Sequence, residues 1–194
     1  LKPSDGGLVA VPSQDMVLGI YYLTQERPGS IGEGHYFKNL NEAILAYENG
    51  YVKLHSRIHV RVTKKMPDGT EKTGTVESTL GRFIFNEILP QDLGFVDRSK
   101  PENDLVLEVD FHVGKKGLKQ ILEKVINIHG ATTTAEVLDD IKAMGYKYST
   151  RAAMTVSISD MTVPEKKPAL IKQAQDTVDL ITKNYKRGLI TEEE

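Results

Sequence analysis

Cysteine is absent from this 194-residue sequence. Its absence excludes disulfide bonds, thiolate catalysis and cysteine-based zinc or iron–sulfur sites. A chain without cysteine is compatible with the cytoplasm, which is the location we expect. No stretch approaches the roughly 20 consecutive apolar residues that a membrane-spanning helix requires, so we expect no membrane partner.

An excess of charge of one sign is also missing. The 25 lysines and arginines stand against 27 aspartates and glutamates, which gives a formal net charge of -2. So small a net charge disfavours a chain that binds nucleic acid over its whole surface, and it leaves only local basic stripes for such contacts. Hydrophobic residues make up 39% and charged residues 27%, which indicates a folded chain rather than a disordered one.

The two ends of the sequence indicate a piece of a longer polypeptide. The sequence begins at Leu1, without an initiator methionine or a signal segment. Near the other end, Thr191 and Glu194 have the spacing of a helix-opening capping box. We therefore expect a helix to begin at Thr191 and to continue past the last residue.

The first quarter of the sequence predicts two helices. Apolar residues recur at helical spacing over 14–24, and Ser13 is suited to cap this helix. A Gly- and Pro-rich loop follows over 27–34. A shorter helix is predicted over 42–48, with Asn41 as its N-cap.

Strands are predicted next. Alternation of apolar and polar residues over 52–62 has the period of a strand. Pro67-Asp68-Gly69 predicts a tight turn, so an antiparallel partner should occupy 70–77. The apolar segment 82–89 is ambiguous, and we favour a strand. A short strand-like run lies within 105–113.

A pair of helices follows the strands. The first is predicted over 116–129 and stops at Gly130, and the second runs from a capping box at Thr133 to Gly145. About four residues join them, so the two should pack against each other. Alternation over 154–158 then predicts another short strand.

The last predicted helix decides the architecture. It begins near Pro168 and ends at Gly188. Apolar residues spaced 3, 4, 3 and 4 apart give it an a/d seam of just over two heptads. The seam residues are Ile171, Ala174, Val178, Ile181 and Tyr185.

We favour one arm of a coiled-coil hairpin for this helix, with the returning arm missing. The alternative is an amphipathic helix that lies on the core of its own domain. The predicted fold class is therefore α+β: mixed strands with a helical pair, followed by one arm of an antiparallel coiled-coil hairpin.

Two histidines have a spacing that needs interpretation. On a helix, His55 and His59 could bind one metal ion, but on a strand they lie about 13 Å apart, which is too far. We favour a solvated polar face. The alternative is that this face, with Lys53, Arg57 and Arg61, touches phosphates or an acidic neighbour.

Catalytic motifs are not found. The segment Gly32-Glu33-Gly34 lacks the rest of a dinucleotide-binding fingerprint, and there is no Walker loop. No cluster of aspartates has the spacing that would hold Mg²⁺ for phosphoryl chemistry, and no nucleophile–base pair stands out. We therefore expect this segment to be inactive in isolation.

Five segments form a recognisable pattern, in one order from end to end. They are Pro12–Thr24; Thr79–Arg82 with Phe85–Pro90; Gly145-Tyr146 with Tyr148–Arg151; Asp160–Lys167; and Arg187–Glu194. Together these segments resemble the family of bacterial RNA polymerase β′ subunits. Ala152-Ala153 departs from the Ser-Gly that is usual there, which leaves the local turn open.

The resemblance implies a function in transcription. The family copies DNA into RNA by nucleotidyl transfer, with Mg²⁺ held by an aspartate triad that this sequence lacks. It implies a pore domain over 1–145 and the start of a funnel, or rim-helix, domain over 146–194, truncated at the hairpin tip. Such parts wall the secondary channel through which nucleotides enter. The implied segment binds no cofactor itself, because the Mg²⁺ ligands lie elsewhere in the subunit.

The implied partners are those of the whole enzyme: the remainder of β′, the β, α and ω subunits, the DNA template and RNA. The rim hairpin of such enzymes also docks transcript-cleavage factors of the Gre type. Lys183, Lys186 and Arg187 near the tip are candidates for that contact. The alternative for these residues is ordinary complementarity with the helix C-terminal dipole.

Three more residues are candidates for lining or supporting the channel. Gln14 and Asp15 match the pore motif. The alternative for Asp15 is that it only caps its helix. Arg82 follows a glycine and is suited to clamp backbone carbonyls or a neighbouring carboxylate. The alternative function is a stand-alone protein-interaction module with a coiled-coil docking arm.

Overall fold

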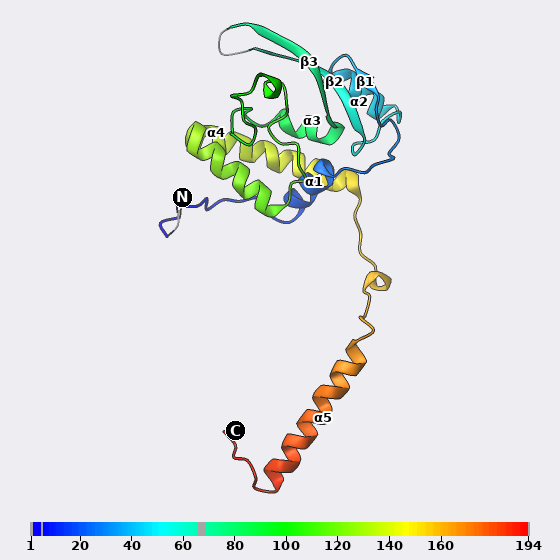
Figure 1. Ribbon diagram of the computed structural model, residues 1–194, viewed down its shortest axis with the longest axis vertical. Helices are drawn as coiled ribbons and strands as arrows, with labels where there is room; N and C mark the ends of the chain where they lie inside the picture. Colours follow the sequence, from blue (N-terminus) through cyan, green and yellow to red (C-terminus); the bar gives the residue numbers. More distant parts are fainter. Residues whose placement is uncertain (1, 5, 66–68, 194) are drawn as a thin grey trace. The chain divides into compact units, whose positions relative to one another are not determined.

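The computed structural model describes residues 2–4, 6–65 and 69–193 (Figure 1). It divides into two compact units, Leu1–Met154 and Thr155–Glu194. The first unit combines a three-stranded mixed sheet with helices, and the second holds a further helix. The predicted α+β class is confirmed. Within the described residues, no helix has the length and apolar character needed to cross a membrane.

The sheet has the order β1-β2-β3, with β1 parallel and β3 antiparallel to β2. Its strands are β1 (Tyr36–Phe37), β2 (Arg57–Lys65) and β3 (Glu71–Thr79). The predicted hairpin partner is confirmed as β3, and Val60 stands opposite Val76 in the register. Both side chains are buried on the inner face of the sheet. Two residues of the predicted turn, Pro67 and Asp68, lie outside the described residues.

The predicted strand over 52–62 begins too early, because its first five residues are tied to the loop before β1. The Ser56 hydroxyl donates to the Ile31 carbonyl at 2.6 Å, and the Arg27 amide donates to the His55 carbonyl at 3.1 Å. These bonds fold the segment into turns, and β2 starts only at Arg57.

The two helices predicted in the first quarter are confirmed as α1 (Asp15–Thr24) and α2 (Leu40–Glu48). Both predicted N-caps are wrong. Gln14 caps α1 with a positive φ of 49° and no side-chain bond, and Asn39 caps α2 by accepting from the Glu42 amide at 2.9 Å.

The apolar segment that we favoured as a strand is a helix, α3 (Leu80–Asn86). The Thr79 hydroxyl caps it by accepting from the Arg82 amide at 3.3 Å. Every residue of α3 is buried. A helix surrounded on all sides shows no amphipathic stripe, which is why its sequence does not distinguish it from a strand.

The strand predicted within 105–113 is also absent, although Leu107, Val109 and Val113 are buried. The Asn86 side chain satisfies this backbone instead. Its amide donates to the Val109 carbonyl at 2.8 Å and its oxygen accepts from the Val109 amide at 3.0 Å. One side-chain amide thus takes the place of a neighbouring strand.

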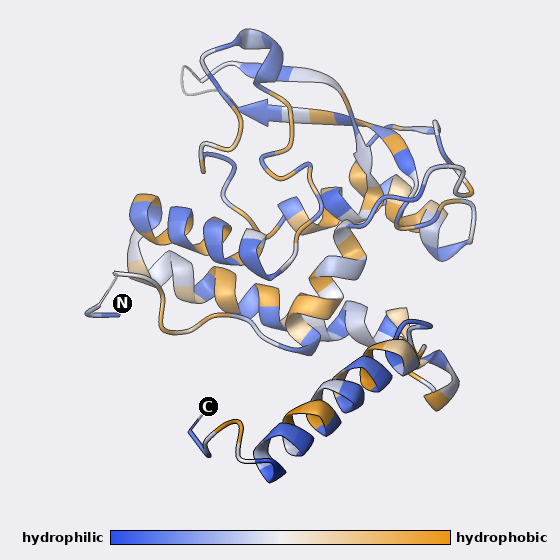
Figure 2. Ribbon diagram, turned by 60° about the horizontal axis from the view of Figure 1, so that its bottom comes forward, coloured by the Kyte–Doolittle hydropathy of each residue, from blue (hydrophilic) through white to orange (hydrophobic). Residues whose placement is uncertain are grey.

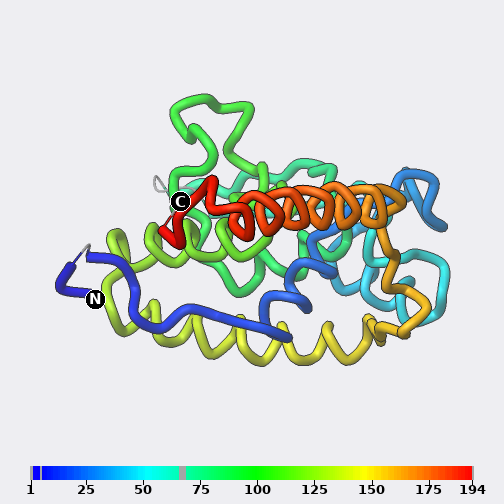
Figure 3. The backbone as a smooth tube through the Cα atoms, turned by 90° about the horizontal axis from the view of Figure 1, so that it is seen from below, coloured from blue at the N-terminus to red at the C-terminus, as the bar shows by residue number. Residues whose placement is uncertain are grey.

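The predicted helical pair is confirmed within α4 (Lys115–Ala152), which is interrupted at Gly130. Gly130 has φ 79° and ψ -174°, a conformation that favours glycine. Figures 1 and 3 show the chain doubling back at this position. The four-residue linker and the cap at Thr133 are wrong, because a single residue joins the two helical halves. The second half continues past Gly145 to Ala152.

Glycines bring the backbone of two helices against α1. A Cβ on Gly19 would lie 1.8 Å from the Gly145 carbonyl oxygen in α4. A Cβ on Gly81 in α3 would lie 1.9 Å from the Leu23 carbonyl oxygen. The backbone of α1 is therefore in direct contact with the backbone of α4 at Gly19 and with the backbone of α3 at Leu23.

The second unit contains the predicted last helix as α5 (Lys167–Lys186), with a proline in its first turn and Gly188 at φ 71° after its end. The strand predicted over 154–158 is absent, and a short 3-10 turn covers Ile158–Asp160. Residues 191–193 are not helical, while Glu194, the last residue of the expected capping box, lies outside the described residues.

No described residue of α5 is buried. Figure 2 shows apolar residues interspersed with polar ones along this helix. The larger members of the predicted seam remain open to solvent, with Ile181 50% and Ile171 57% exposed. Among the described residues of the second unit, the seam is therefore an unpaired apolar stripe.

Replacing Gly19 with alanine should destabilise the fold, because the new methyl group would collide with backbone that cannot rotate away. We expect Gly19→Ala to lower the free energy of unfolding by about 1–3 kcal/mol. Urea unfolding of the chain measures this difference. The control is Gly117→Ala, whose Cβ meets its nearest neighbour at 3.5 Å and should be neutral or stabilising. Equal losses in the two variants would contradict the packing argument.

Candidate functional site

The candidate residues of the first unit lie at opposite ends of α1. Gln14 and Asp15 stand at its first turn, while Arg82, on α3, reaches its last residue. A helix of 10 residues is about 15 Å long. The structure thus brings Gln14 and Asp15 together and places Arg82 apart from them.

Arg82 binds the C-terminal end of α1. Its guanidinium is nearly buried, with 7% of the side chain exposed, and its Nε donates to the Thr24 carbonyl at 3.1 Å. Its Nη1 contacts Glu26 Oε2 and Asp110 Oδ1, both at 3.2 Å. A cation at this end also complements the helix dipole. The predicted clamp on a carbonyl and a carboxylate is confirmed.

A second arginine shares the same carboxylates. Arg57 on β2 bonds to Glu77 at 2.8 Å and to Glu26 at 3.1 Å. Asp110 lies 3.8 Å from its Nη2. Burial opposes the charge, but the bond to Glu77 and the nearby carboxylates raise the pKa of Arg57 above its usual value.

We call these five side chains the arginine network: Glu26, Arg57, Glu77, Arg82 and Asp110. They come from the segment after α1, from both long strands, from α3 and from the segment before α4. Ser78 of β3 adds a hydroxyl that donates to Asp110. The network joins the sheet to the C-terminal end of α1.

The sequence named Arg82 as a candidate. For Arg57 it favoured a solvated face and gave contact with an acidic neighbour as the alternative, and the carboxylates beside Arg57 agree with that alternative. The positions of the three carboxylates relative to the arginines depend on the fold. The available signal was indirect: an arginine within an apolar helix must find acceptors, and carboxylates are its usual partners.

His55 was expected on the polar face of a strand and is instead buried, with 5% of the residue exposed. Its Nδ1 lies 3.1 Å from the Gln25 carbonyl, so Nδ1 carries the proton. Its Nε2 is buried and has no hydrogen-bond partner in the part of the chain that the structure describes. The Tyr22 ring stands edge-on at 4.6 Å. Burial lowers the pKa of His55 against the opposing effect of the Gln25 bond, and Arg27 and His112 lower it further.

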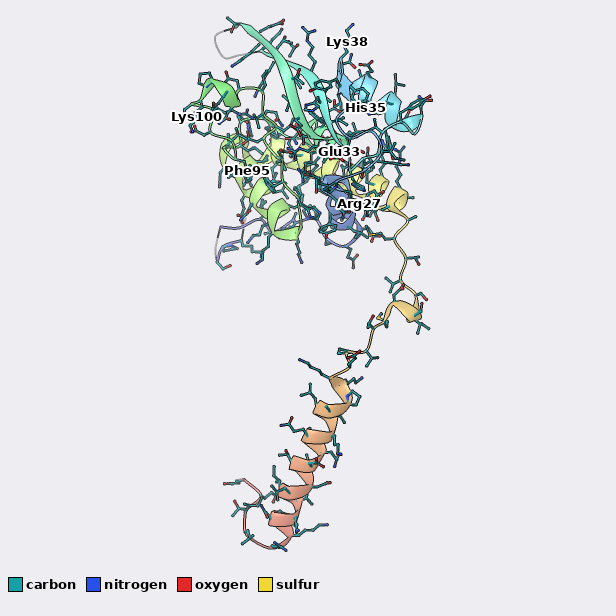
Figure 4. The ribbon with its side chains drawn as sticks, turned by 45° about the vertical axis from the view of Figure 1, so that its right-hand side comes forward. Arg27, Glu33, His35, Lys38, Phe95 and Lys100 are labelled. Carbon is teal, nitrogen blue, oxygen red and sulfur yellow. The ribbon has the colours of Figure 1, made fainter. Side chains whose placement is uncertain are left out.

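His59 behaves differently from His55. Its ring stacks on Tyr36 of β1 at 4.3 Å with an interplanar angle of 12°. Figure 4 shows Arg27, Glu33, His35 and Lys38 along the loop that leads from α1 to β1 and α2. Among the described residues, no three histidine, aspartate or glutamate side chains are grouped closely enough to hold a metal ion.

Gln14 is one of two described non-glycine residues with a positive φ. Its side chain and that of Asp15 are exposed. The next residue, Met16, lies against the backbone of Gly145, where a Cβ would come within 2.6 Å. The contact between α1 and α4 therefore holds the chain just after this strained position.

In the second unit, Lys183, Lys186 and Arg187 lie together. They line one shallow depression with Asp179 and Thr182, and all three cations are exposed. In the heptad register set by the a/d seam, the side chains of these three residues point away from the seam. The two lysines lie in the last turn of α5, where they also complement the helix dipole.

Comparison with known proteins gives one family and many relatives. The family model described as RNA polymerase Rpb1, domain 3 matches residues 1–161. The chain is 71% identical over all 194 residues to the DNA-directed RNA polymerase subunit beta' of Lachnoclostridium phytofermentans. It is 57% identical to that of Acetivibrio thermocellus and 53% identical to that of Clostridium perfringens, again over its full length. It spans only 16–17% of the length of these relatives.

Arg82→Met should destabilise the chain, because the change leaves two carboxylates and a helix-end carbonyl without their shared donor. We expect a loss of about 2–4 kcal/mol in the free energy of unfolding, reduced from the fully buried case because the carboxylates are partly exposed. Urea unfolding measures it. Lys119→Met, which removes an exposed pair with Glu123, is the control and should cost less than about 0.5 kcal/mol. A similar loss in both variants would contradict the clamp.

Acidification should destabilise the chain through His55. Its lowered folded-state pKa means that the unfolded form, which titrates near 6.5, binds the proton more tightly. The stabilising contribution is therefore complete above about pH 6.5 and is lost as the pH falls toward the folded-state value. We expect His55→Gln to flatten the dependence of Tm on pH between 7.5 and 5.5. An unaltered slope in His55→Gln would argue against this assignment.

Proposed function

The chain belongs to the RNA polymerase Rpb1 domain 3 family, and from this premise we propose that it serves DNA-templated RNA synthesis as a non-catalytic segment of a β′ subunit. The observation that carries the proposal is the 71% identity to one such subunit over the whole chain. The nucleotidyl transfer itself would be performed by the rest of the subunit. Mg²⁺ would be bound there as well, since the described residues offer no group suited to hold it.

The partners follow from this assignment. A segment of about one sixth of the subunit's length works only with the remainder of β′ and with the β, α and ω subunits. DNA and RNA are then partners of the whole enzyme. We assign 1–145 to the pore domain and 146–194 to the start of the funnel, or rim-helix, domain.

The first unit is proposed to form part of the wall of the secondary channel. Gln14 and Asp15 supply exposed polar groups at the start of α1, directly before the close contact of Met16 with Gly145. Arg82 supports this wall from the other end of α1 by clamping its last carbonyl. A wall residue is useful only if it is held in place, and the two contacts along α1 provide that rigidity.

The second unit is proposed to dock transcript-cleavage factors of the Gre type. The apolar seam of α5 would pair with a returning helix of the full subunit, which would complete an antiparallel coiled coil. Lys183, Lys186 and Arg187 point away from the seam and would stay free to bind a factor. The grouping of the three cations around one depression supports this division.

Ile181→Asp in the full-length subunit tests the docking arm. A carboxylate in the seam should break the coiled coil and reduce factor-stimulated transcript cleavage by about tenfold or more, because buried charge is costly. RNA synthesis without the factor should be preserved. Cleavage of a stalled transcript, with and without the factor, measures both.

The matched control is Leu180→Asp, the same substitution one residue earlier and off the seam, at a position that is 59% exposed. It should leave stimulated cleavage unchanged. A normal response to the factor in Ile181→Asp, or an equal loss in Leu180→Asp, would rule out the proposed arm. Absence of RNA synthesis by an enzyme that contains the unmodified subunit would rule out the polymerase assignment itself.

A further inference from the structure

Strand β3 lies at the margin of the sheet, on the side of β2 that faces away from β1 (Figure 1). The His59 amide of β2 donates to the His35 carbonyl beside β1. Because the backbone groups of successive residues point to opposite sides of a strand, those of Val60 point to β3. Val60 stands opposite Val76 in the register, so Val76 bonds to β2. The residues that alternate with Val76 therefore point their backbone groups away from the sheet.

Four residues of β3 form this open edge: Glu71, Thr73, Thr75 and Glu77. All four are exposed, and within the described part of the chain no hydrogen bond reaches their backbone amides or carbonyls. These groups recur every second residue, about 7 Å apart. An extended backbone is the structure that offers donors and acceptors with the same repeat. The chemistry of the edge thus calls for another strand.

The edge lacks the features that protect most open strands. Natural edge strands are short or bulged, or they carry proline or outward-pointing lysine. The nine residues of β3 instead pair with β2 in one unbroken register, and they include no proline. The one lysine of β3, Lys72, donates to Asp104 at 2.7 Å. Its charge is therefore engaged by the chain itself.

The inner face of β3, in contrast, is already covered. A Cβ on Gly74 would lie 2.6 Å from the Leu105 side chain, and Asp104 holds Lys72 on the same face. The segment 104–105 thus lies against the inner face of β3 and forms no ladder with its edge. A new strand could add at the edge without displacing the core.

We propose that β3 pairs with an extended segment from the remainder of the β′ subunit, which adds a fourth strand to the sheet. The inference rests on the proposed function, because this chain spans only 16% of the length of one such subunit. Glu71 has no ion pair among the described residues, whereas Glu77 is bonded to Arg57. A basic side chain beside Glu71 is therefore the charge that the incoming strand should carry.

A second copy of this chain fits the edge less well. Antiparallel pairing over the whole of 71–77 has its centre at Gly74, and it places Glu71 opposite Glu77 at both ends. Like charges directly opposite each other destabilise a pair of strands. A shorter overlap avoids this repulsion but gives up hydrogen bonds.

Hydrogen–deuterium exchange, measured on this chain and on the assembled polymerase, tests the pairing. In the chain alone, the amides of Thr73 and Thr75 should exchange freely, while those of Gly74 and Val76 are protected by β2. In the polymerase, Thr73 and Thr75 should exchange at least about tenfold more slowly. Equal rates in the chain and in a polymerase that makes RNA would overturn the inference. Failure of the polymerase to make RNA would count against the proposed function instead.

Photocrosslinking identifies the occupant. With p-benzoylphenylalanine in place of Thr75 in the full-length subunit, we expect a crosslink to a segment of the same subunit that lies outside the present chain. A crosslink to a different subunit, to a second copy of β′, or to no protein at all would overturn the inference.

Thr73→Pro removes one outward amide and should reduce the yield of this crosslink by about fivefold or more. The matched control is Thr63→Pro. The Thr63 and Thr73 hydroxyls bond to each other at 2.9 Å, so both variants lose that contact, but the Thr63 amide points to the side of β2 away from β3. The control should keep the yield, and equal losses would contradict the pairing. Exchange in the unmodified polymerase needs no variant, so it decides the question even if a proline variant does not fold.

Discussion

The close approach of backbone to α1 is the constraint on which the first unit depends. Gly81 brings α3 so near to the Leu23 carbonyl that no side chain fits between them. The next residue, Arg82, can then reach the Thr24 carbonyl with its Nε. A glycine followed by an arginine thus performs two linked tasks: the first lets the helices touch, and the second satisfies the helix end that this contact buries.

The arginine network explains how the sheet and α1 keep a fixed relation. Burying the Arg82 guanidinium is costly unless its donors are occupied, and here Thr24, Glu26 and Asp110 occupy them. The partner carboxylates are about 30% exposed, so water still solvates part of their charge. Since the members come from elements far apart in sequence, the network can form only when the sheet, α3 and α1 are all in place. It therefore favours one arrangement over many that bury similar apolar area.

The elements that could be predicted from the sequence are those with one solvent-exposed face and one buried face. Helix α1 and most of strand β2 were found because their apolar residues recur with a clear period, and β3 was found from the tight turn that precedes it. Helix α3 was misassigned because it is buried on every side. The run containing Val109 was misassigned because the Asn86 side chain, and not a strand, satisfies its backbone. No local pattern encodes either situation, since both depend on what the rest of the chain places around them.

The candidate site shows the same division. The clamp by Arg82 could be anticipated from a charged residue beside a glycine in an apolar run. Its partners could not, because Glu26 and Asp110 are 84 residues apart in sequence and are brought together only by the fold. His55 was misplaced for a related reason, since the loop that holds it in a turn is closed by bonds from Ser56 and Arg27.

The two units differ in the source of their stability, and this difference bears on what each can do. The first unit has a continuous buried core and can hold exposed groups such as Tyr21 in fixed positions. Helix α5 has no buried residue, and a helix of 20 residues without a packed face is only marginally stable in water. Its apolar seam is therefore the feature that most needs a partner. Because the cations near its end lie off that seam, pairing of the seam would order the helix and still leave the cations accessible.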